Sequence, residues 1–186
     1  MRDLSLHILD LTQNSVRANA TLVQLDITVD ERKWITIRIT DDGCGMDAEL
    51  KERVLSPFAT TRTTRKVGLG LPLLRMTAEQ TGGTLTIESQ VGAGTTVTAG
   101  FHTDHIDCPP LGDLGGTVSL LIQGAPDVEW TWKHTTPRGS YFLDTRQLRE
   151  ILGPDVPLSE PSVTLWIREY LQEQEAAIQT ETIHRK

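Results

Sequence analysis

The chain has 186 residues, a formal net charge of −7 and two cysteines, Cys44 and Cys108. This length suits one domain, or one domain with a sizeable appendage. The acidic charge argues against nucleic acid as a partner, because nucleic-acid binders carry basic patches, and two distant cysteines make no disulfide framework. No apolar run approaches the ~20 residues of a membrane span, and the amphipathic N-terminus does not resemble a secretion signal. We therefore expect a cytoplasmic protein without a membrane partner.

Residues 3–19 are predicted to form a helix with two distinct faces. The members of the two faces recur at three- and four-residue spacing: Leu4, Ile8, Leu11, Ser15 and Ala18 on the first, His7, Asp10, Asn14 and Arg17 on the second. Asp10 and Asn14 are four residues apart, so their side chains point the same way. A carboxylate and an amide oxygen are suitable ligands for Mg²⁺, directly or through water. The alternative is a solvated polar face.

Two strands are predicted next, at residues 22–29 and 34–40, because apolar and polar residues alternate there. Asp41 directly follows the second strand and is itself followed by Gly43 and Gly45. A carboxylate at this place can accept a hydrogen bond from the exocyclic amine of an adenine, and glycines let a base approach the backbone closely. The alternative is a surface turn with acidic caps. Residues 47–55 then predict a short helix with Asp47 as its N-cap.

Residues 56–71 have no periodicity and are predicted to form a loop, and residues 71–83 a helix with Pro72 in its first turn. Gly68 and Gly70 directly precede this helix. Backbone N–H groups at a helix start form a natural phosphate cradle. The basic residues upstream, Arg62, Arg65 and Lys66, can neutralise phosphate charge. A single Gly-x-Gly is a weak signal by itself, because many loops contain one.

Residues 84–90 and 95–101 predict two more strands, joined by a glycine-containing link at 91–94. The stretch GAGTTV at 92–97 can bring Thr95 near a phosphate or an adenine. The alternative is an ordinary tight hairpin.

A run of turn-forming residues after position 102 predicts a boundary between a domain at 1–102 and an appendage at 103–186. Within the appendage, residues 117–123 suit either a helix or a strand. Residues 128–134 and 140–144 predict strands, and residues 145–152 and 162–177 predict helices.

The appendage holds three groups of residues with open interpretations. The first group is Trp130, Trp132, Tyr141 and Phe142, the second is Val163, Trp166, Ile167, Tyr170 and Leu171, and the third is His102, His105 and Cys108. The first group, the aromatic residues, predicts a compact hairpin core, with a partner-docking surface as the alternative. The second group forms one face of a helix, which either packs on the hairpin or lies at a homodimer interface. The third group offers three candidate metal ligands without a fourth, which favours a plain loop.

The order of these motifs resembles the ATP-binding domain shared by gyrase, the Hsp90 chaperones, sensor histidine kinases and MutL. DLTQNS at 10–15 is similar to the N box, DDGCG at 41–45 to the G1 box and SPF at 56–58 to the F box. GLGL at 68–71 is similar to the G2 box and GAGTTV at 92–97 to the G3 box. The resemblance covers about residues 1–102. It implies an α+β fold, a two-layer sandwich whose mixed, mostly antiparallel sheet carries helices on one face.

The same resemblance implies that ATP and Mg²⁺ are the cofactors. Asp41 would read the adenine, Asn14 would hold the Mg²⁺, and Asp10 would stand at the catalytic position, where the hydrolysing members usually have Glu. The implied ATP-binding residues are Asn14, Arg17, Asp41, Gly43, Gly45, Met46, Phe58, Thr61, Arg62, Arg65, Lys66, Gly68, Leu69, Gly70, Leu71 and Thr95.

Residues 57–83 most resemble the end of a sensor histidine kinase catalytic domain. The expected ATP-binding domain begins at residue 1 and His7 lies inside the first helix, so we expect phosphotransfer to another protein, as in the stand-alone anti-sigma-factor serine kinases of bacteria. The resemblance thus implies a bacterial regulatory protein kinase with a separate, unidentified protein partner. Two alternatives stay open: a binding module in which ATP orders residues 56–67 without phosphotransfer, and a simple ATPase in which Asp10 activates water.

Overall fold

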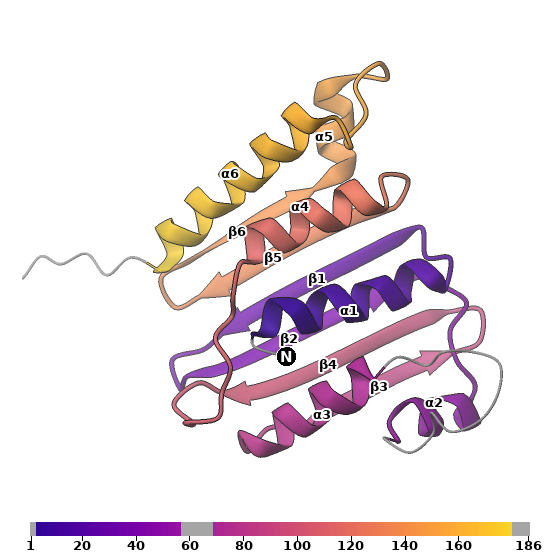
Figure 1. Cartoon of the computed structure of the whole chain (residues 1–186), viewed down its shortest axis with the longest axis vertical. Helices are drawn as coiled ribbons and strands as arrows, with labels where there is room; N and C mark the ends of the chain where they lie inside the picture. The colour runs from indigo at the N-terminus through magenta and orange to yellow at the C-terminus, as the bar shows by residue number, and fades with distance from the viewer. Residues whose placement is uncertain (1–2, 57–68, 180–186) are drawn as a thin grey trace, which may run out of the picture.

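A single six-stranded sheet with helices on one face forms the molecule (Figure 1). The computed structural model describes residues 3–56 and 69–179. The strands lie in the order β3-β4-β2-β1-β5-β6. The strands are β1 (Leu22–Val29), β2 (Trp34–Asp41), β3 (Leu85–Gln90), β4 (Gly94–His102), β5 (Glu129–Thr136) and β6 (Gly139–Asp144). The helices are α1 (Leu4–Arg17), α2 (Ala48–Val54), α3 (Gly70–Gln80), α4 (Leu114–Gly124), α5 (Thr145–Leu152) and α6 (Pro161–Gln179). The predicted α+β class and layer arrangement are confirmed.

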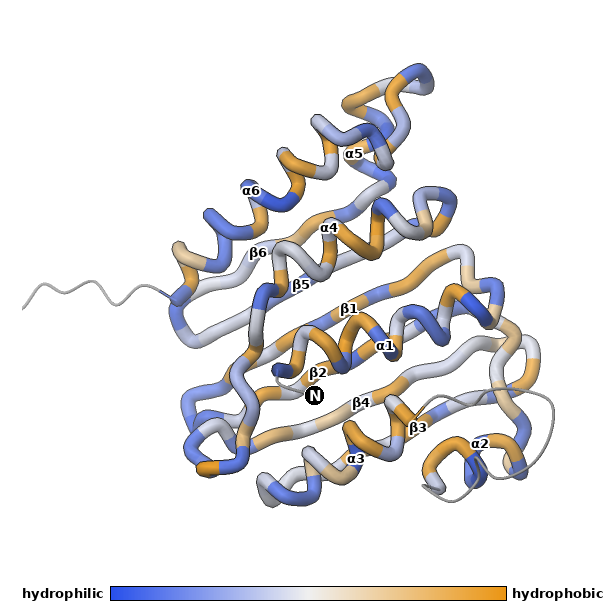
Figure 2. Tube along the Cα trace, viewed as in Figure 1, coloured by the Kyte–Doolittle hydropathy of each residue, from blue (hydrophilic) through white to orange (hydrophobic). Residues whose placement is uncertain are grey.

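The sequence pattern of each strand explains which face of the sheet is covered. In β1, Val23, Leu25 and Ile27 are buried, and the residues between them point to the opposite face. This alternation follows from the two-residue period of a strand, and it is visible along the central strands in Figure 2. Helices α1, α3, α4 and α6 cover the apolar face (Figure 1). None of these helices, within the residues described, has the length and apolar character that crossing a membrane requires.

The residues that follow position 103 extend the same sheet. Strand β5 pairs in parallel with β1, from Leu22 opposite Glu129 to Thr28 opposite Thr135, and antiparallel with β6. Asp113 is the N-cap of helix α4, and its carboxylate accepts the N–H of Gly116 at 2.8 Å. It packs against α6, where Ser119 Oγ donates to the carbonyl oxygen of Thr164 at 2.9 Å. The two regions of the predicted division thus share one sheet, and the division itself stays a prediction.

Two aromatic residues of the groups singled out in the sequence are half exposed. Trp130, Trp132 and Tyr141 are buried, as predicted, but Phe142 is 49% exposed. Phe142 follows Tyr141 in β6, and consecutive strand residues face opposite sides of a sheet. In α6, Trp166 is 50% exposed and stacks on Tyr170 with a centroid separation of 5.3 Å. The undecided segment 117–123 is helical, within α4.

Candidate functional site

The first contact of the candidate site joins α1 to the start of α3. A Cβ added at Gly70 would lie 1.7 Å from Asp10 Oδ2, so only a glycine lets the Asp10 carboxylate come this close. The N-terminal end of a helix carries partial positive charge, which favours a nearby carboxylate or phosphate. Leu69, the N-cap residue of α3, supplies no side-chain hydrogen bond to the helix start. The first turn of α3 therefore presents backbone N–H groups beside Asp10.

Asn14 and Arg17 lie one turn further along α1, toward the surface. Arg17 Nη1 donates a hydrogen bond of 3.4 Å to Asn14 Oδ1. The amide oxygen of Asn14 therefore faces the Arg17 guanidinium. No group of three or more His, Cys, Asp or Glu side chains suitable for a metal lies among residues 3–56 and 69–179. Mg²⁺ is held in proteins by one or two protein oxygens together with waters and substrate phosphates.

The second contact fixes Asp41, which lies at the end of β2 and is only 8% exposed. Ser15 Oγ donates to Asp41 Oδ2 at 2.6 Å, and the backbone N–H of Gly43 donates to Asp41 Oδ1 at 3.0 Å. A carboxylate offers about four lone-pair positions. Asp41 is thus held in one orientation and keeps acceptor capacity for a ligand.

A row of hydroxyl groups continues from Asp41 across the neighbouring strands. Thr95 of β4 is the register partner of Asp41 and also of Ser89 in β3. The Ser89 and Thr95 hydroxyl oxygens lie 2.9 Å apart, and Ser89 Oγ also accepts the backbone N–H of Met46 at 2.8 Å. The structure therefore brings Asp41, Met46 and Thr95 together at one end of the sheet.

The glycines after Asp41 are required by the packing of the chain itself. Gly45 has φ +67°, and a Cβ there would lie 1.9 Å from the carbonyl oxygen of Gln90. At Gly43, a Cβ would meet Ala18 at 2.9 Å. Both glycines therefore let the turn after β2 lie against the β3–β4 hairpin and the end of α1, a packing role beside the ligand role that the resemblance implies.

The remaining predicted residues fall into two groups. Leu71 is buried in the core, whereas Leu69 is 53% exposed beside the start of α3. The others lie outside the described residues: Phe58, Thr61, Arg62, Arg65, Lys66 and Gly68.

Sequence reasoning missed the role of Ser15 and Ser89. The sequence placed Ser15 on the apolar face of the first helix. A lone hydroxyl on such a face indicates a hydrogen bond to a buried polar partner.

The predicted polar face of the first helix also contained His7, which is 1% exposed. Burial lowers the pKa of His7 below its ordinary value of 6.5, and the smaller effects of Asp10 and Asp3 act in the opposite direction. His7 is thus a packed residue of α1.

Several known proteins are similar to this chain. The heme sensor protein HssS of Staphylococcus saprophyticus is 35% identical over 94 residues, which are 50% of this chain and 20% of that protein. The sensor histidine kinase ZraS of Escherichia coli is 33% identical over 92 residues, 49% of this chain and 20% of that protein. The chain thus spans about a fifth of the length of these two relatives.

A solved structure, described as the N terminal domain of a DNA repair protein, is similar over 83% of this chain and 58% of its own, with a TM-score of 0.50. At 17% identity this likeness concerns the fold alone. Residues 2–105, more than half of the chain, match the model of the histidine kinase-, DNA gyrase B-, and HSP90-like ATPase family. The chain belongs to this family of ATPases.

Proposed function

We propose that this chain binds Mg-ATP between α1, the end of β2 and the start of α3, and that it is a protein kinase acting on a separate regulatory protein. The observation that carries the proposal is the buried Asp41 carboxylate, which Ser15 and the Gly43 N–H hold in place. A fixed carboxylate with remaining acceptor capacity suits the exocyclic amine of adenine. Family membership and the relatedness to sensor histidine kinases support the same nucleotide.

In this proposal, the phosphate groups of the nucleotide lie at the start of α3. Backbone N–H groups there would donate to phosphate oxygens, together with Gly68 and the basic residues Arg62, Arg65 and Lys66. Asn14 Oδ1 would hold the Mg²⁺, which supplies charge neutralisation of the phosphates. The Asp10 carboxylate lies against Gly70, so it would face the terminal phosphate and would orient or deprotonate the attacking hydroxyl.

Catalysis in this arrangement consists of positioning and charge neutralisation, as phosphoryl transfer requires. The acceptor hydroxyl or imidazole would come from the partner protein, which we propose to be a cytoplasmic regulator in a bacterial signalling system. The chain offers His7 as an internal candidate, but His7 is buried against the core and is poorly accessible to a phosphate.

Calorimetry of ATP binding, with and without Mg²⁺, tests the nucleotide site. We expect Asp41→Asn to weaken binding by more than about tenfold, which is about 1.4 kcal/mol. The matched control is Asp26→Asn in β1, on the opposite face of the sheet, where Asp26 pairs in register with Arg38 and Lys133. Equal binding by all three proteins, or no binding by the wild type at millimolar ATP, would refute the site.

The fate of the γ-phosphate separates the kinase from its two alternatives. With γ-³²P-labelled ATP, a kinase moves label onto a second protein, whereas an ATPase releases labelled phosphate alone. A nucleotide-gated module binds its partner in the presence of ATP and leaves the ATP intact. Asp10→Asn is expected to abolish transfer while ATP still binds, and unchanged transfer in this variant would show that Asp10 is not the catalytic base.

A further inference from the structure

Strand β6 ends the sheet, and one row of its backbone groups has no strand beside it (Figure 1). Among the described residues, β6 pairs with β5 alone. Thr136 and Gly139 close a two-residue turn, so this pair and every second pair after it exchange hydrogen bonds across the hairpin. The N–H and C=O groups of Ser140 and Phe142 therefore point away from the sheet.

The sequence of β6 lacks the features that usually prevent a strand edge from pairing, which are Lys, Pro and β-bulges. The strand reads GSYFLD, with a continuous register against β5. Its acidic residue, Asp144, is paired with Arg146 at 2.7 Å, and its Phe142 side chain is 49% exposed. The other edge strand, β3, carries an exposed Glu88 near its middle. Two copies joined at β3 would bring like charges together, so β6 is the edge that suits strand addition.

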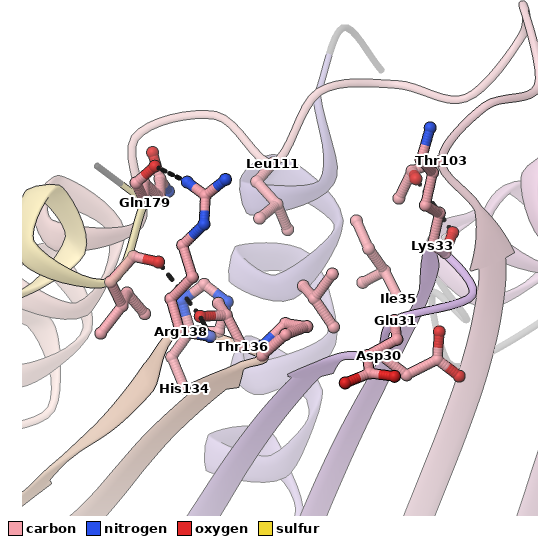
Figure 3. Close-up of a pocket in the computed structure, with 13 residues that line it drawn as sticks. Asp30, Glu31, Lys33, Ile35, Thr103, Leu111, His134, Thr136, Arg138 and Gln179 are labelled. Carbon is pink, nitrogen blue, oxygen red and sulfur yellow. Dashed lines mark hydrogen bonds between the residues drawn. The ribbon is translucent and has the colours of Figure 1, made fainter. Parts of the chain in front are cut away.

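Helix α6 runs along β6 and is fixed to the β5–β6 hairpin (Figure 1). At the turn of the hairpin, Arg138 Nη1 donates to the carbonyl oxygen of Gln179 at the end of α6 (Figure 3). Further along, Glu175 of α6 accepts the hydroxyl of Tyr141. Strand and helix therefore form a two-layer unit at this edge of the molecule.

The outer side of α6 is aromatic. A Cβ added at Gly115 of α4 would lie 3.3 Å from both the Arg168 carbonyl oxygen and Gln172 Cγ, so these two residues mark the side of α6 that faces α4. With 3.6 residues per turn, Trp166 and Tyr170 lie on the opposite side of the helix. Trp166 is half exposed there and stacks on Tyr170. This aromatic pair lies on the same edge of the molecule as β6.

Two apolar surfaces thus flank one edge: Phe142 on the open face of the sheet, and Trp166 with Tyr170 in the helix layer. A single peptide strand would pair with β6 and leave the helix layer uncovered. A second copy, turned about a two-fold axis perpendicular to the sheet, presents the same strand and the same helix in matching layers. We infer that this chain forms a homodimer through β6, in which the two sheets become one continuous sheet and the two α6 helices pack antiparallel.

The size of this contact predicts a weak dimer. It is about 20 Å long, the length of β6, and about 20 Å deep, the thickness of one sheet and one helix. It therefore buries on the order of 1,000 Å² in total, at the lower end for specific interfaces. The proposed nucleotide site lies at α1 and the start of α3, so the dimer leaves it open and does not depend on it.

Sedimentation velocity of the wild type, from about 1 μM to about 500 μM, tests the dimer. We expect a shift from monomer to dimer with a midpoint in the micromolar range, ending at two copies because a two-fold contact is closed. Added salt should strengthen the association, since each copy has a net charge of −7 and carries an exposed Glu173 in α6. A monomer throughout this range, or a polymer that keeps growing, would overturn the inference.

Amide hydrogen exchange locates the contact. The N–H groups of Ser140 and Phe142 gain strand partners in the dimer, so their exchange should slow as the protein concentration rises through the midpoint of association. The exchange of amides in β3, at the other edge, should keep its rate. A dimer whose formation leaves the exchange of Ser140 and Phe142 unchanged is built on another surface and contradicts the β6 contact.

Two pairs of variants test the strand layer and the helix layer separately. Phe142→Lys places like charges side by side near the two-fold axis and is expected to weaken association by at least about tenfold. Its control, Thr86→Lys, adds the same charge to the exposed side of β3 and should dimerise like the wild type.

Trp166→Glu is expected to weaken association by about tenfold as well. Its control is Leu165→Glu, at a similarly exposed position that borders a groove between α6, α4 and α1, and this variant should dimerise like the wild type. The thermal midpoint of each variant shows that it is folded. Folded Phe142→Lys and Trp166→Glu proteins that dimerise as tightly as their controls would refute the proposed interface.

Discussion

A hydrogen bond of 2.6 Å from Ser15 Oγ to Asp41 Oδ2 ties the middle of α1 to the end of β2. Both side chains are buried. Helix α1 also carries Asp10, whose carboxylate lies against Gly70. One helix thus fixes the carboxylate assigned to the adenine and places the carboxylate assigned to the phosphate, so a shift of α1 would disturb both ends of the nucleotide site together.

Ser15→Ala is expected to lower both stability and ATP affinity. The change removes a hydrogen bond to a buried charged group, which costs about 1.5–3 kcal/mol of unfolding free energy. Asp41 then keeps the Gly43 N–H but loses its fixed orientation, so ATP affinity should fall roughly fivefold, or about 1 kcal/mol. Urea unfolding and calorimetry measure the two effects.

The control for this prediction is Ser119→Ala, which removes another buried hydroxyl hydrogen bond, the one to the Thr164 carbonyl oxygen. Ser119 lies in α4, away from the nucleotide site, so its variant should lose stability and keep full ATP affinity. If Ser15→Ala binds ATP as tightly as Ser119→Ala does, the hydroxyl has no part in the nucleotide site.

Gly70→Ala is expected to destabilise the fold and to impair ATP binding, because the new methyl group would overlap Asp10 Oδ2. Overpacking of this kind costs about 1–3 kcal/mol. The double variant Gly70→Ala with Asp10→Ala removes the overlapping atoms and should regain much of the lost stability. Thermal unfolding of the single and double variants measures this coupling.

Gly124→Ala in α4 is the matched helical control, since a Cβ there meets no atom within 4 Å among the described residues. Its stability should be unchanged or higher by up to about 1 kcal/mol. A Gly70→Ala protein as stable as Gly124→Ala would contradict the close approach of Asp10.

The buried His7 predicts a loss of stability in weak acid. Because burial lowers the folded-state pKa of His7 below 6.5, the unfolded chain binds a proton there at a higher pH than the folded chain does. The contribution of neutral His7 to the free energy of unfolding is therefore fully present above about pH 6.5. It falls as the pH drops toward the folded-state pKa of His7. The slope from this one group is at most about 1.4 kcal/mol per pH unit.

Urea unfolding from about pH 7.5 to about pH 5.5 tests the assignment. His7→Leu should flatten this part of the stability curve, whereas His105→Gln, in the exposed segment after β4, should leave it as in the wild type. A wild-type slope that persists in His7→Leu would assign the pH dependence to other groups.

Tyr141→Phe is expected to loosen α6 without changing the nucleotide site. The hydroxyl accepts from Trp132 Nε1 at 2.8 Å and donates to Glu175. Its removal leaves two buried polar groups short of a partner, which costs about 1–3 kcal/mol. Hydrogen exchange should show faster exchange in α6, while calorimetry should show wild-type ATP affinity.

The control is Tyr170→Phe, the same atomic change on the half-buried side of α6, where the ring stacks on Trp166. Its exchange pattern should match that of the wild type. If both variants behave alike, the buried cluster around Glu175 does not hold the helix in place.

Local sequence patterns were sufficient to predict most of the helices and strands. The alternation of apolar and polar residues indicates which face of a strand is buried, and helical spacing indicates which side of a helix is buried. Neither pattern indicates the order of the strands in the sheet. The parallel pairing of β1 with β5 depends on contacts between distant segments, and no local pattern contains it.

The points that the sequence interpretation missed or left open have equally local causes. Phe142 was grouped with Tyr141 by residue type, although strand geometry turns adjacent side chains to opposite faces. Segment 117–123 is apolar almost throughout, so its periodicity could not distinguish a buried helix from a strand. Ser15 was counted with its apolar neighbours, because only the folded chain brings Asp41 against it.

The pairing of Leu22 with Glu129 has a consequence for the order of folding during synthesis. Strand β1 leaves the ribosome long before β5 is made, so its backbone edge is open during that time. An unpaired strand edge with apolar residues on one face is a site for wrong pairing with other chains. Closing the sheet then requires a contact between distant segments, which slows folding. The nascent chain is therefore most prone to aggregation in the interval before its β5 segment emerges.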